Sequence, residues 1–335
     1  MNAENKACFE VMRPGPLTTV QDLGRRGHAE LGFAECGACD KYALRLANLL
    51  CGNEEGEAAL EYTLSGPALR FIQDAVFVLA GAETEATLDG APCPMYAPCL
   101  APAGAVLDVG SCVNGLRGYI AVRGGIAVPA YLGSRATDLK CHLGGFAGRA
   151  LKAGDRVPIV ADGDARAQAA ALSRRAAGIE RGLFAPLVPR GWLGWEALPV
   201  LRAVPGPQDD AFTEAGLAAF AREIYTVSPK SDRMAARLAG QAVAAKGGVD
   251  IVSDGIVEGS VQIAADGQPI VMLADHQTTG GYAKIATVLP TDIPALAQLR
   301  PGARVRFRLV TREEGMRALR LEGERLKAVR GAMRG

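Results

Sequence analysis

The sequence predicts a mainly β protein with a few short helices, built as two β-barrel-like subdomains. A length of 335 residues is enough for two ordinary hydrophobic cores. The 41 glycines and 19 prolines are spread along the whole chain, which is typical of short strands joined by tight turns. Short apolar segments recur on both sides of a polar, Ala- and Arg-rich stretch at residues 161–180, which indicates a boundary between two units.

The first subdomain is expected at residues 8–165. One helix should begin near Asp40, present apolar residues on one face and stop at Gly52. The other elements read as short strands, because β-branched and apolar residues alternate with Gly, Pro and Asp-Gly turns. The expected strands are Val76–Ala80, Ala86–Leu88, Val106–Val109 and Gly118–Val122.

A linker is expected at 166–198, a second β subdomain at 199–311, and a helix or tail at 312–335. The second subdomain should contain a helix capped by Thr213. Residues 151–157 resemble residues 299–305, which leaves open an ancient duplication of one β unit. The strands expected here are Val200–Val204, Val249–Val252, Ser260–Ile263, Pro269–Ala274 and Val305–Val310.

Composition excludes several classes of function. The formal net charge of +1 gives no electrostatic footprint for nucleic acid or an anionic membrane. The amino terminus has neither a basic region nor an apolar core of the signal-peptide kind, and no stretch reaches eighteen apolar residues, so a cytoplasmic protein is expected. All eight cysteines precede residue 142 and are interpreted as reduced apolar residues.

The sequence also lacks the common motifs for binding metals and cofactors and for hydrolytic catalysis. The pair Cys36 and Cys39 forms a CxxC, but Cys93 and Cys99 have the wrong spacing to complete a zinc site, so no metal is expected. The chain has no P-loop, no GxGxxG after a strand, no HExxH and no GxSxG. It also lacks a Met-Lys-Met, and therefore no covalently attached biotin is expected on this chain.

The most informative stretch follows the buried strand expected at 269–274. Asp275, Gln277, Tyr282 and Lys284 place a carboxylate, an amide, a phenol and an ammonium around Gly280-Gly281. Polar groups at the end of a buried strand are costly unless they pair with each other or with a ligand. The two glycines are interpreted as a turn that lets a ligand approach the backbone. These four side chains are the candidate catalytic residues.

Each candidate has a structural alternative. Asp275 would merely shape the turn by accepting hydrogen bonds from the backbone of Thr278 and Thr279. Lys284 would lie on a solvated strand face, and Arg135 and Arg233 would form surface ion pairs. Gln21, Asp22 and Arg25 would form a structural turn in which Asp22 pairs with Arg25.

A series of motifs resembles the biotin-dependent carboxyltransferase family. Its members include the C subunit of bacterial 5-oxoprolinase, the regulator KipA and the allophanate hydrolase subunit 2-like region of urea carboxylase. The resemblance covers about residues 10 to 310 in the family's order. The motifs that carry it are Arg13–Gly27, Gly37–Asp40, Ala47–Asn53, Ala59–Thr63, Gly124–Ile126, Leu132–Thr137, Ser231–Met234, Gly259–Gln262 and Asp275–Tyr282.

The resemblance implies a cyclophilin-like second subdomain and an enzyme subunit that is inactive alone. It implies an ATP-dependent opening of 5-oxoproline to L-glutamate, with a B-like subunit of the allophanate hydrolase subunit 1 type and a LamB/YcsF-like A subunit. ATP, with Mg, would be bound at least partly by a partner subunit. Two alternatives remain: carboxyl transfer from carboxybiotin to urea or a similar amide, and a KipA-type regulatory binding protein without turnover.

Because ATP would phosphorylate the amide oxygen, the site should hold cations around the transferred phosphoryl group. Arg135, Arg149, Arg233 and Lys284 have the right charge. His276 stands where the family commonly has Arg, and would bind an anion only when protonated. The candidate binding residues are Arg135, Asp232, Arg233, Gln262, His276, Thr278, Gly280 and Gly281.

Overall fold

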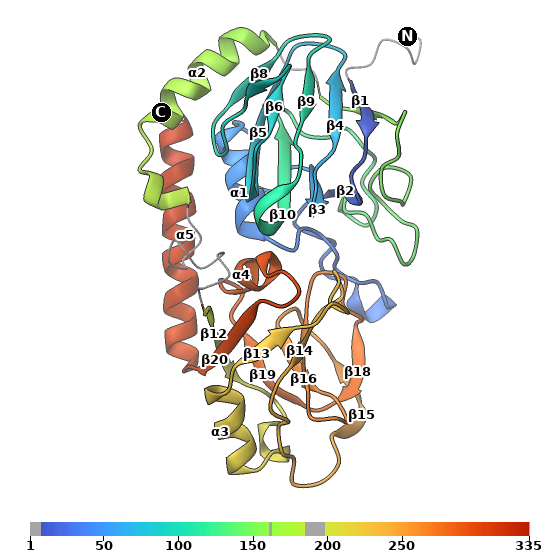
Figure 1. Cartoon of the computed structure of the whole chain (residues 1–335), viewed down its shortest axis with the longest axis vertical. Helices are drawn as coiled ribbons and strands as arrows, with labels where there is room; N and C mark the ends of the chain where they lie inside the picture. Colours follow the sequence, from blue (N-terminus) through green and yellow to red (C-terminus); the bar gives the residue numbers. More distant parts are fainter. Residues whose placement is uncertain (1–7, 161–162, 185–197, 335) are drawn as a thin grey trace. The chain divides into compact units, whose positions relative to one another are not determined.

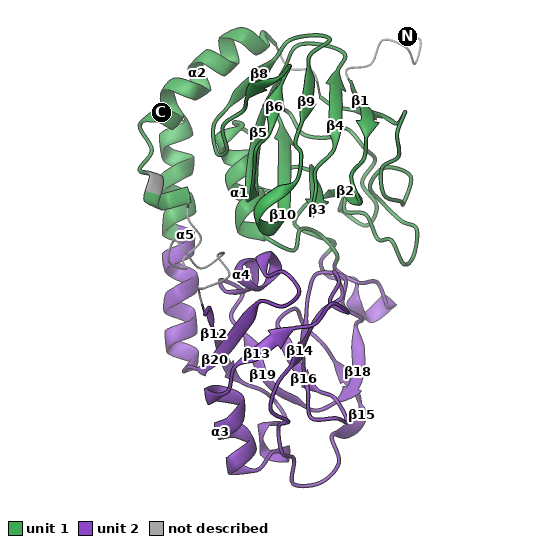
Figure 2. Ribbon diagram, viewed as in Figure 1, with its two compact units in different colours: residues 1–25, 36–185, 324–335 green, residues 26–35, 186–323 purple. Residues whose placement is uncertain are grey.

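The computed structural model describes residues 8–160, 163–184 and 198–334, which form two compact units (Figure 2). Unit 1 contains residues 1–25, 36–185 and 324–335, and unit 2 contains residues 26–35 and 186–323. The expectation of a mainly β chain with a few short helices is confirmed (Figure 1). No described helix has both the length and the apolar character needed to cross a membrane.

Unit 1 contains two antiparallel sheets. The six-stranded sheet has the order β11-β1-β4-β9-β6-β7, and the five-stranded sheet has the order β2-β3-β10-β5-β8. The inward residues of both sheets share one core, in which Phe71 and Phe77 stack with ring centroids 5.5 Å apart. The strands are β1 (Cys8–Arg13), β2 (Leu17–Gln21), β3 (Ala59–Thr63), β4 (Ala68–Phe71), β5 (Ala75–Thr84), β6 (Thr87–Leu88), β7 (Ala91–Pro92), β8 (Cys99–Ala101), β9 (Val106–Asp108), β10 (Cys112–Val122) and β11 (Arg156–Pro158).

The helices of unit 1 follow the local signals in the sequence. Helix α1 (Lys41–Leu50) begins after Asp40, whose carboxylate accepts a hydrogen bond from the Ala43 N–H at 2.8 Å. Its apolar face packs against β5 and β10. The stretch expected as a linker contains α2 (Ala165–Ala177) and a 3-10 helix at Arg181–Phe184, and residues 185–197 lie outside the described part of the chain. The carboxyl-terminal stretch forms α5 (Arg312–Arg334).

Unit 2 is built on a closed barrel with the strand order β12-β19-β16-β17-β14-β13-β20. The barrel closes through the parallel pairing of β12 with β20. A separate two-stranded sheet, β15-β18, belongs to the same unit. The strands are β12 (Val200–Pro205), β13 (Tyr225–Val227), β14 (Ala235–Ala239), β15 (Asp250–Gly255), β16 (Ser260–Ile263), β17 (Pro269–Met272), β18 (Thr279–Tyr282), β19 (Lys284–Val288) and β20 (Arg304–Leu309), and the helices are α3 (Glu214–Arg222) and α4 (Ile293–Gln298).

Alternation along the strands separates the inside of the barrel from its outer face. On β16, Val261 and Ile263 belong to the barrel core. On β17, Val271 belongs to the same core, whereas Ile270 and Met272 pack in a separate cluster with Ile256. Because successive side chains of a strand point to opposite faces, this second cluster lies on the outer face of the barrel wall.

One expectation about the local backbone is wrong. The Gly280-Gly281 pair is not a turn, because both residues lie within β18, which pairs with β15. Asp254 is opposite Gly280 and Asp250 is opposite Tyr282 in this pairing. Gly280, but not Gly281, allows close packing of β18 against Ile256 and Gln262.

Candidate functional site

Gln262 and Lys284 lie side by side on the outer face of the barrel, because a β-bulge sets their register. Antiparallel pairing of β16 with β19 places Val261 opposite Ala286, and the register then shifts so that Gln262 is opposite Lys284. Both Val261 and Ala286 belong to the barrel core. The bulge thus turns Lys284 to the face that carries Gln262. Both side chains are nearly inaccessible, with Gln262 2% and Lys284 3% exposed.

Lys284 is held by a closed group of polar contacts. Its Nζ donates to the Asp254 carboxylate at 2.8 Å, and its backbone N–H donates to Oε1 of Gln208 at 3.1 Å. The amide of Gln208 in turn donates to the Asp254 carboxylate at 3.4 Å. The hydrogen bond from Lys284 is the main reason that the pKa of Asp254 lies below its usual range. Lys284 is therefore not on a solvated strand face, and that structural alternative is wrong.

Gly280 lets β18 pass close to this group. A Cβ atom at Gly280 would come within 2.5 Å of Ile256 Cδ1 and 2.6 Å of Gln262 Nε2. The Gln262 amide donates to the backbone carbonyl of Tyr282 at 3.4 Å. Gln262, Gly280, Lys284 and the backbone of Tyr282 are thus brought together in the structure. Gln277, Thr278 and Gly281 are half-buried in the same segment, and the Thr278 carbonyl accepts from the Ile256 N–H at 3.0 Å.

A second polar group lies where β17 leaves the barrel. Arg233 forms a two-pronged ion pair with Asp275, with Nε and one terminal nitrogen each 2.9 Å from a carboxylate oxygen. The side chain of Asp275 therefore binds Arg233 rather than the backbone of Thr278 and Thr279. Asp232 accepts from the N–H groups of Met234 and Ala235, which shapes the loop before β14. His276 is 6% exposed, and its Nδ1 lies 2.7 Å from the Gln277 carbonyl oxygen.

Arg135 belongs to unit 1, whereas the other candidate site residues belong to unit 2. Its Nε donates to the Val128 carbonyl at 3.0 Å, and its guanidinium lies 3.7 Å from Glu57. Its backbone N–H donates to Asp22 at 2.6 Å, so Asp22 supports this loop and does not pair with Arg25 as expected. Arg25, which is 2% exposed, donates instead to the Ala136 carbonyl at 2.5 Å.

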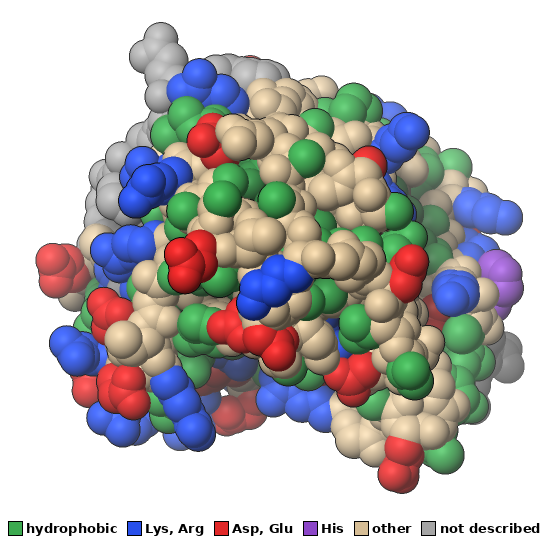
Figure 3. All heavy atoms as spheres, turned by 90° about the horizontal axis from the view of Figure 1, so that it is seen from below, with side chains coloured by type: hydrophobic (Ala, Val, Ile, Leu, Met, Phe, Trp, Pro, Cys, Tyr) green, Lys and Arg blue, Asp and Glu red, His purple; other side chains and the backbone are tan. Residues whose placement is uncertain are grey.

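All four cations proposed to handle phosphate have a carboxylate partner. Besides Arg135, Arg233 and Lys284, Arg149 forms a two-pronged ion pair with Asp155 at 2.7 and 2.8 Å. This pairing lowers the pKa of Asp155 and raises that of Arg149. Basic and acidic side chains are likewise interspersed over the face shown in Figure 3. The positive charge of each of these four cations is therefore already offset by a nearby carboxylate.

Two residues of the group were missed in the sequence, Gln208 and Asp254. Gln208 follows the Pro-Gly-Pro turn at 205–207, where the Gly206 N–H donates to the Ile285 carbonyl at 2.9 Å. A Cβ atom at Gly206 would lie 2.1 Å from the Lys284 carbonyl oxygen, so the turn needs glycine to bring Gln208 beside Lys284. The Pro-Gly-Pro turn is therefore the sequence feature that could have pointed to Gln208. Asp254 is an ordinary acidic residue of an exposed strand, and no motif marked it.

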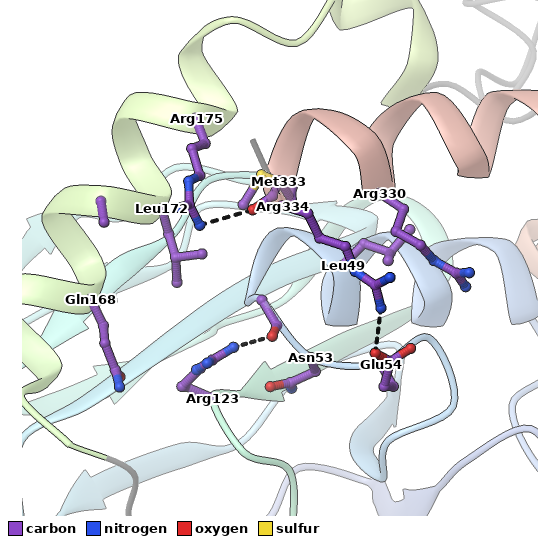
Figure 4. A pocket seen from close by; sticks show the side chains of 12 residues that line it. Leu49, Asn53, Glu54, Arg123, Gln168, Leu172, Arg175, Arg330, Met333 and Arg334 are labelled. Carbon is purple, nitrogen blue, oxygen red and sulfur yellow. Dashed lines mark hydrogen bonds and ion pairs between the residues drawn. The ribbon is translucent and has the colours of Figure 1, made fainter.

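A separate cavity of about 290 Å³ in unit 1 is rich in arginine (Figure 4). Arg123 donates to the Gly52 carbonyl after α1, and Arg175 donates to the Met333 carbonyl near the end of α5 at 3.0 Å. Arg334 pairs with Glu54 at 2.6 Å, and Arg330 pairs with Glu55. Cations at the carboxyl ends of helices offset the helix dipole. These arginines therefore have structural partners, and the polar group of unit 2 stays the candidate site.

The chemistry of the unit 2 site suits the amide group of a small polar ligand. Its two cations are matched by two carboxylates, and the remaining functional groups are the amides of Gln262 and Gln277, the phenol of Tyr282 and exposed backbone of β18. A side-chain amide offers one acceptor and two donors, which complements another amide. Within the described residues, no group of three or more His, Cys, Asp or Glu side chains is arranged to hold a metal ion.

Comparison with known proteins shows to which family the chain belongs. The family model described as "Carboxyltransferase domain, subdomain A and B" matches residues 31–309. The chain is 38% identical to the 5-oxoprolinase C subunit of Haemophilus influenzae, covering 90% of this chain and 91% of that protein. It is 39% identical to the 5-oxoprolinase C subunit of Escherichia coli, covering 92% and 94%.

Two solved structures extend the comparison to the fold. The Kluyveromyces lactis urea amidolyase matches with a TM-score of 0.87 and 28% identity, over 97% of this chain but 20% of that one. The protein TTHA0988 matches with a TM-score of 0.76 and 33% identity, over 90% of this chain and 55% of that one. The chain thus spans a fifth and about half of the lengths of these two proteins.

Proposed function

Because the chain belongs to the family of carboxyltransferase domains with subdomains A and B, we propose that it is the C subunit of an ATP-dependent 5-oxoprolinase. This enzyme would open the lactam of 5-oxoproline to L-glutamate. The proposal is supported by the 38% and 39% identity to two proteins of that name, each matched over at least nine tenths of its length.

The observation that carries the proposal is the group of side-chain amides, phenol and strand backbone over the outer face of the barrel. A lactam is a cis amide, so its N–H and C=O lie on one side of the ring and pair with the edge of a carboxamide through two hydrogen bonds. Gln277 is half-buried and supplies such an edge. Gln262 lies against β18, where its amide donates to the Tyr282 carbonyl, and Tyr282 supplies a phenol.

We assign the binding of the lactam to this chain and the binding of most of the nucleotide to a partner. When bound, ATP would donate its γ-phosphoryl group to the lactam oxygen, which makes the carbonyl carbon a better electrophile for water. The cations of the unit 2 site are already matched by Asp254 and Asp275, which leaves little positive charge for a triphosphate. The triphosphate would therefore require cations of a B-like subunit or a LamB/YcsF-like A subunit, and the Mg bound to it would be held there as well. The isolated chain would be inactive, and a cytoplasmic location stays a prediction.

A second candidate function is carboxyl transfer from carboxybiotin to urea or a similar amide. It is favoured by the urea amidolyase structure, which matches 97% of this chain with a TM-score of 0.87. Urea presents the same carboxamide edge as a lactam, so the same amide contacts would hold it. The two functions differ in the second substrate, which is ATP for the 5-oxoprolinase and carboxybiotin for the carboxyltransferase. The experiment therefore compares turnover with each of them.

The test is ADP release by the chain reconstituted with B-type and A-type partner subunits. Lactam-dependent ADP release is expected with 5-oxoproline, and Gln277→Ala and Tyr282→Phe should each lower kcat/KM at least about tenfold, the effect of about 1.4 kcal/mol in transition-state binding. Tyr131→Phe in unit 1 is the matched control, because this tyrosine is 42% exposed and lies outside the candidate site.

The other outcomes separate the alternatives. Turnover that requires urea, bicarbonate and a biotin carrier, with none on 5-oxoproline, would replace the proposal by carboxyl transfer. Tight binding to the B-type partner without turnover of either substrate would favour a KipA-type regulatory protein. Equal activity of the Gln277, Tyr282 and Tyr131 variants with 5-oxoproline would leave the function in place and move the site elsewhere.

A further inference from the structure

Two cysteines of unit 1 meet outside the proposed site. Cys93 follows β7 and Cys99 begins β8, and their Sγ atoms lie 3.4 Å apart. The sequence alone had given this pair no role, because its spacing does not suit a zinc site. Cys93 is 9% exposed and packs in the core of unit 1, whereas Cys99 is partly exposed.

The loop between the two cysteines is held in place at three points. The Cys93 N–H donates to the Ala86 carbonyl at 2.8 Å, and the Tyr96 N–H donates to the Leu79 carbonyl at 2.7 Å. The Tyr96 hydroxyl accepts from the Gly81 N–H at 3.0 Å. Pro94 and Pro98 stand just inside the two cysteines and restrict the backbone further. The two sulfurs are thus kept together by the folded loop rather than by chance encounter.

We propose that Cys93 and Cys99 form a reversible dithiol–disulfide pair that is oxidised by low-molecular-weight disulfides such as glutathione disulfide. Their sulfurs need to close from 3.4 Å to about 2 Å, the length of a disulfide bond. The link would join the end of β7, in the six-stranded sheet, to the start of β8, in the five-stranded sheet. It is a modification site independent of the proposed lactam chemistry.

The two cysteines have different parts in the exchange. The Cys93 thiol donates a hydrogen bond to Cys99, which lowers the pKa of Cys99 and raises that of Cys93. Cys99 loses its proton first, and its thiolate attacks one sulfur of glutathione disulfide and releases one glutathione thiolate. Cys93 then loses its proton and attacks the Cys99 sulfur of the mixed disulfide, which releases the second glutathione thiolate. Both released thiolates take up the protons lost by the cysteines, so the exchange is balanced.

The folded full-length chain allows a clean test. It is treated with glutathione disulfide, free thiols are blocked with N-ethylmaleimide, and the chain is cleaved before aspartates. Cleavage before Asp89 and Asp108 yields a peptide of residues 89–107 that contains Cys93 and Cys99 and no other cysteine. This peptide should lose two hydrogens, carry no maleimide, and recover two reactive thiols after reduction.

Single variants distinguish the proposed order of attack. Cys93→Ser should trap glutathione on Cys99, because the resolving thiol is missing. Cys99→Ser should leave Cys93 largely reduced, because it is buried. Cys112→Ser is the matched control, since Cys112 is also buried in unit 1 and its thiol faces the Leu116 carbonyl. That variant should form the link at the wild-type rate.

The wild-type chain alone can overturn the proposal, so it does not depend on the variants folding. Exposed Cys141 reports that the oxidant was active. If Cys141 becomes glutathionylated while the peptide of residues 89–107 carries two maleimide groups, no dithiol pair exists. A stable glutathione adduct on Cys99 of the wild-type chain would equally exclude Cys93 as the resolving thiol.

Discussion

Replacing Gly280 by alanine tests whether β18 must pass close to Gln262. The new Cβ would lie 2.5 Å from Ile256 Cδ1 and 2.6 Å from Gln262 Nε2, so each atom must retreat by about 1 Å to reach ordinary contact. Both are the ends of side chains, yet Gln262 is 2% and Ile256 6% exposed. The adjacent Gly281→Ala is the matched control for packing and stability, because the nearest atom to its Cβ is 3.5 Å away.

The two substitutions should differ in sign. Neither glycine has a left-handed φ, so alanine fits the backbone at both positions. Gly281→Ala should be neutral or stabilise by about 0.4–1 kcal/mol, because alanine restricts the unfolded chain. Gly280→Ala has the same gain but an overpacking cost of about 1–3 kcal/mol, so a net loss of about 1 kcal/mol is expected. In a domain of this size that loss lowers Tm by about 2–4 °C.

The assay combines urea unfolding with lactam-dependent ADP release by the reconstituted complex. Gly280→Ala should lower kcat/KM by far more than its small loss of stability suggests, because displacement of the Gln262 amide by about 1 Å disturbs a positioned polar group. If Gly280→Ala and Gly281→Ala have the same stability and the same kcat/KM, β18 does not pack on Gln262 and the proposed site is wrong.

Two further predictions concern the charges. Lys284→Met should leave the free energy of unfolding nearly unchanged while abolishing most activity. Asp254→Asn should lower the free energy of unfolding clearly, because it leaves a buried ammonium without a carboxylate. Urea unfolding and ADP release are measured for both variants, and a Lys284→Met variant that is less stable than Asp254→Asn would contradict this prediction. The carboxyl group of Asp155 has a lowered pKa beside Arg149, so its pairing stabilises the fold above the unfolded-state value of about 3.9 and this stabilisation is lost as the pH falls through the folded-state pKa. The wild type should therefore be more stable than Asp155→Asn at neutral pH and lose that advantage in acid, and a gap in urea midpoint that stays constant with pH would refute the assignment.

Features set by neighbouring residues could be predicted from the sequence. The N-caps Asp40 and Thr213 were both identified, since a cap depends on the three or four residues that follow it. The similar segments at 151–157 and 299–305 also adopt the same turn, in which Gly154 and Gly302 have φ of 85° and 87°. The segments Arg13–Pro16 and Val204–Pro207 also share a Pro-Gly-Pro sequence, but their turns differ, because Gly15 has a φ of 73° and Gly206 lies outside the left-handed region. Local similarity therefore corresponds to the same turn in only one of these two pairs.

Contacts between distant residues could not be predicted in this way. Strict alternation along β19 would place Lys284 on the same face as Ala286 in the barrel core, and nothing local showed that a bulge turns it outward or that β15 and β18 lie near it. Its partners Asp254 and Gln208 are 30 and 76 positions away along the chain. The bulge that places Lys284 opposite Gln262 also arises from pairing between strands. The candidate residues could therefore be identified in the sequence from their side-chain chemistry, whereas their hydrogen-bond and ion-pair partners could be identified only in the folded structure.

The outer face of the barrel itself argues for a functional role of the polar group. Next to Gln262 and Lys284, the same face carries Ile270 and Met272, which pack with Ile256 in an apolar cluster. Apolar packing therefore suffices to attach a covering segment to this wall. The ion pair between the buried Lys284 ammonium and the half-exposed Asp254 carboxylate, 2.8 Å apart, stabilises the fold no more than such apolar packing would. The cost of removing the ammonium from water offsets its attraction to the carboxylate. Because the stability of the barrel does not require the ammonium and amide on this wall, we propose that they serve the binding of a polar ligand by the segment that covers them.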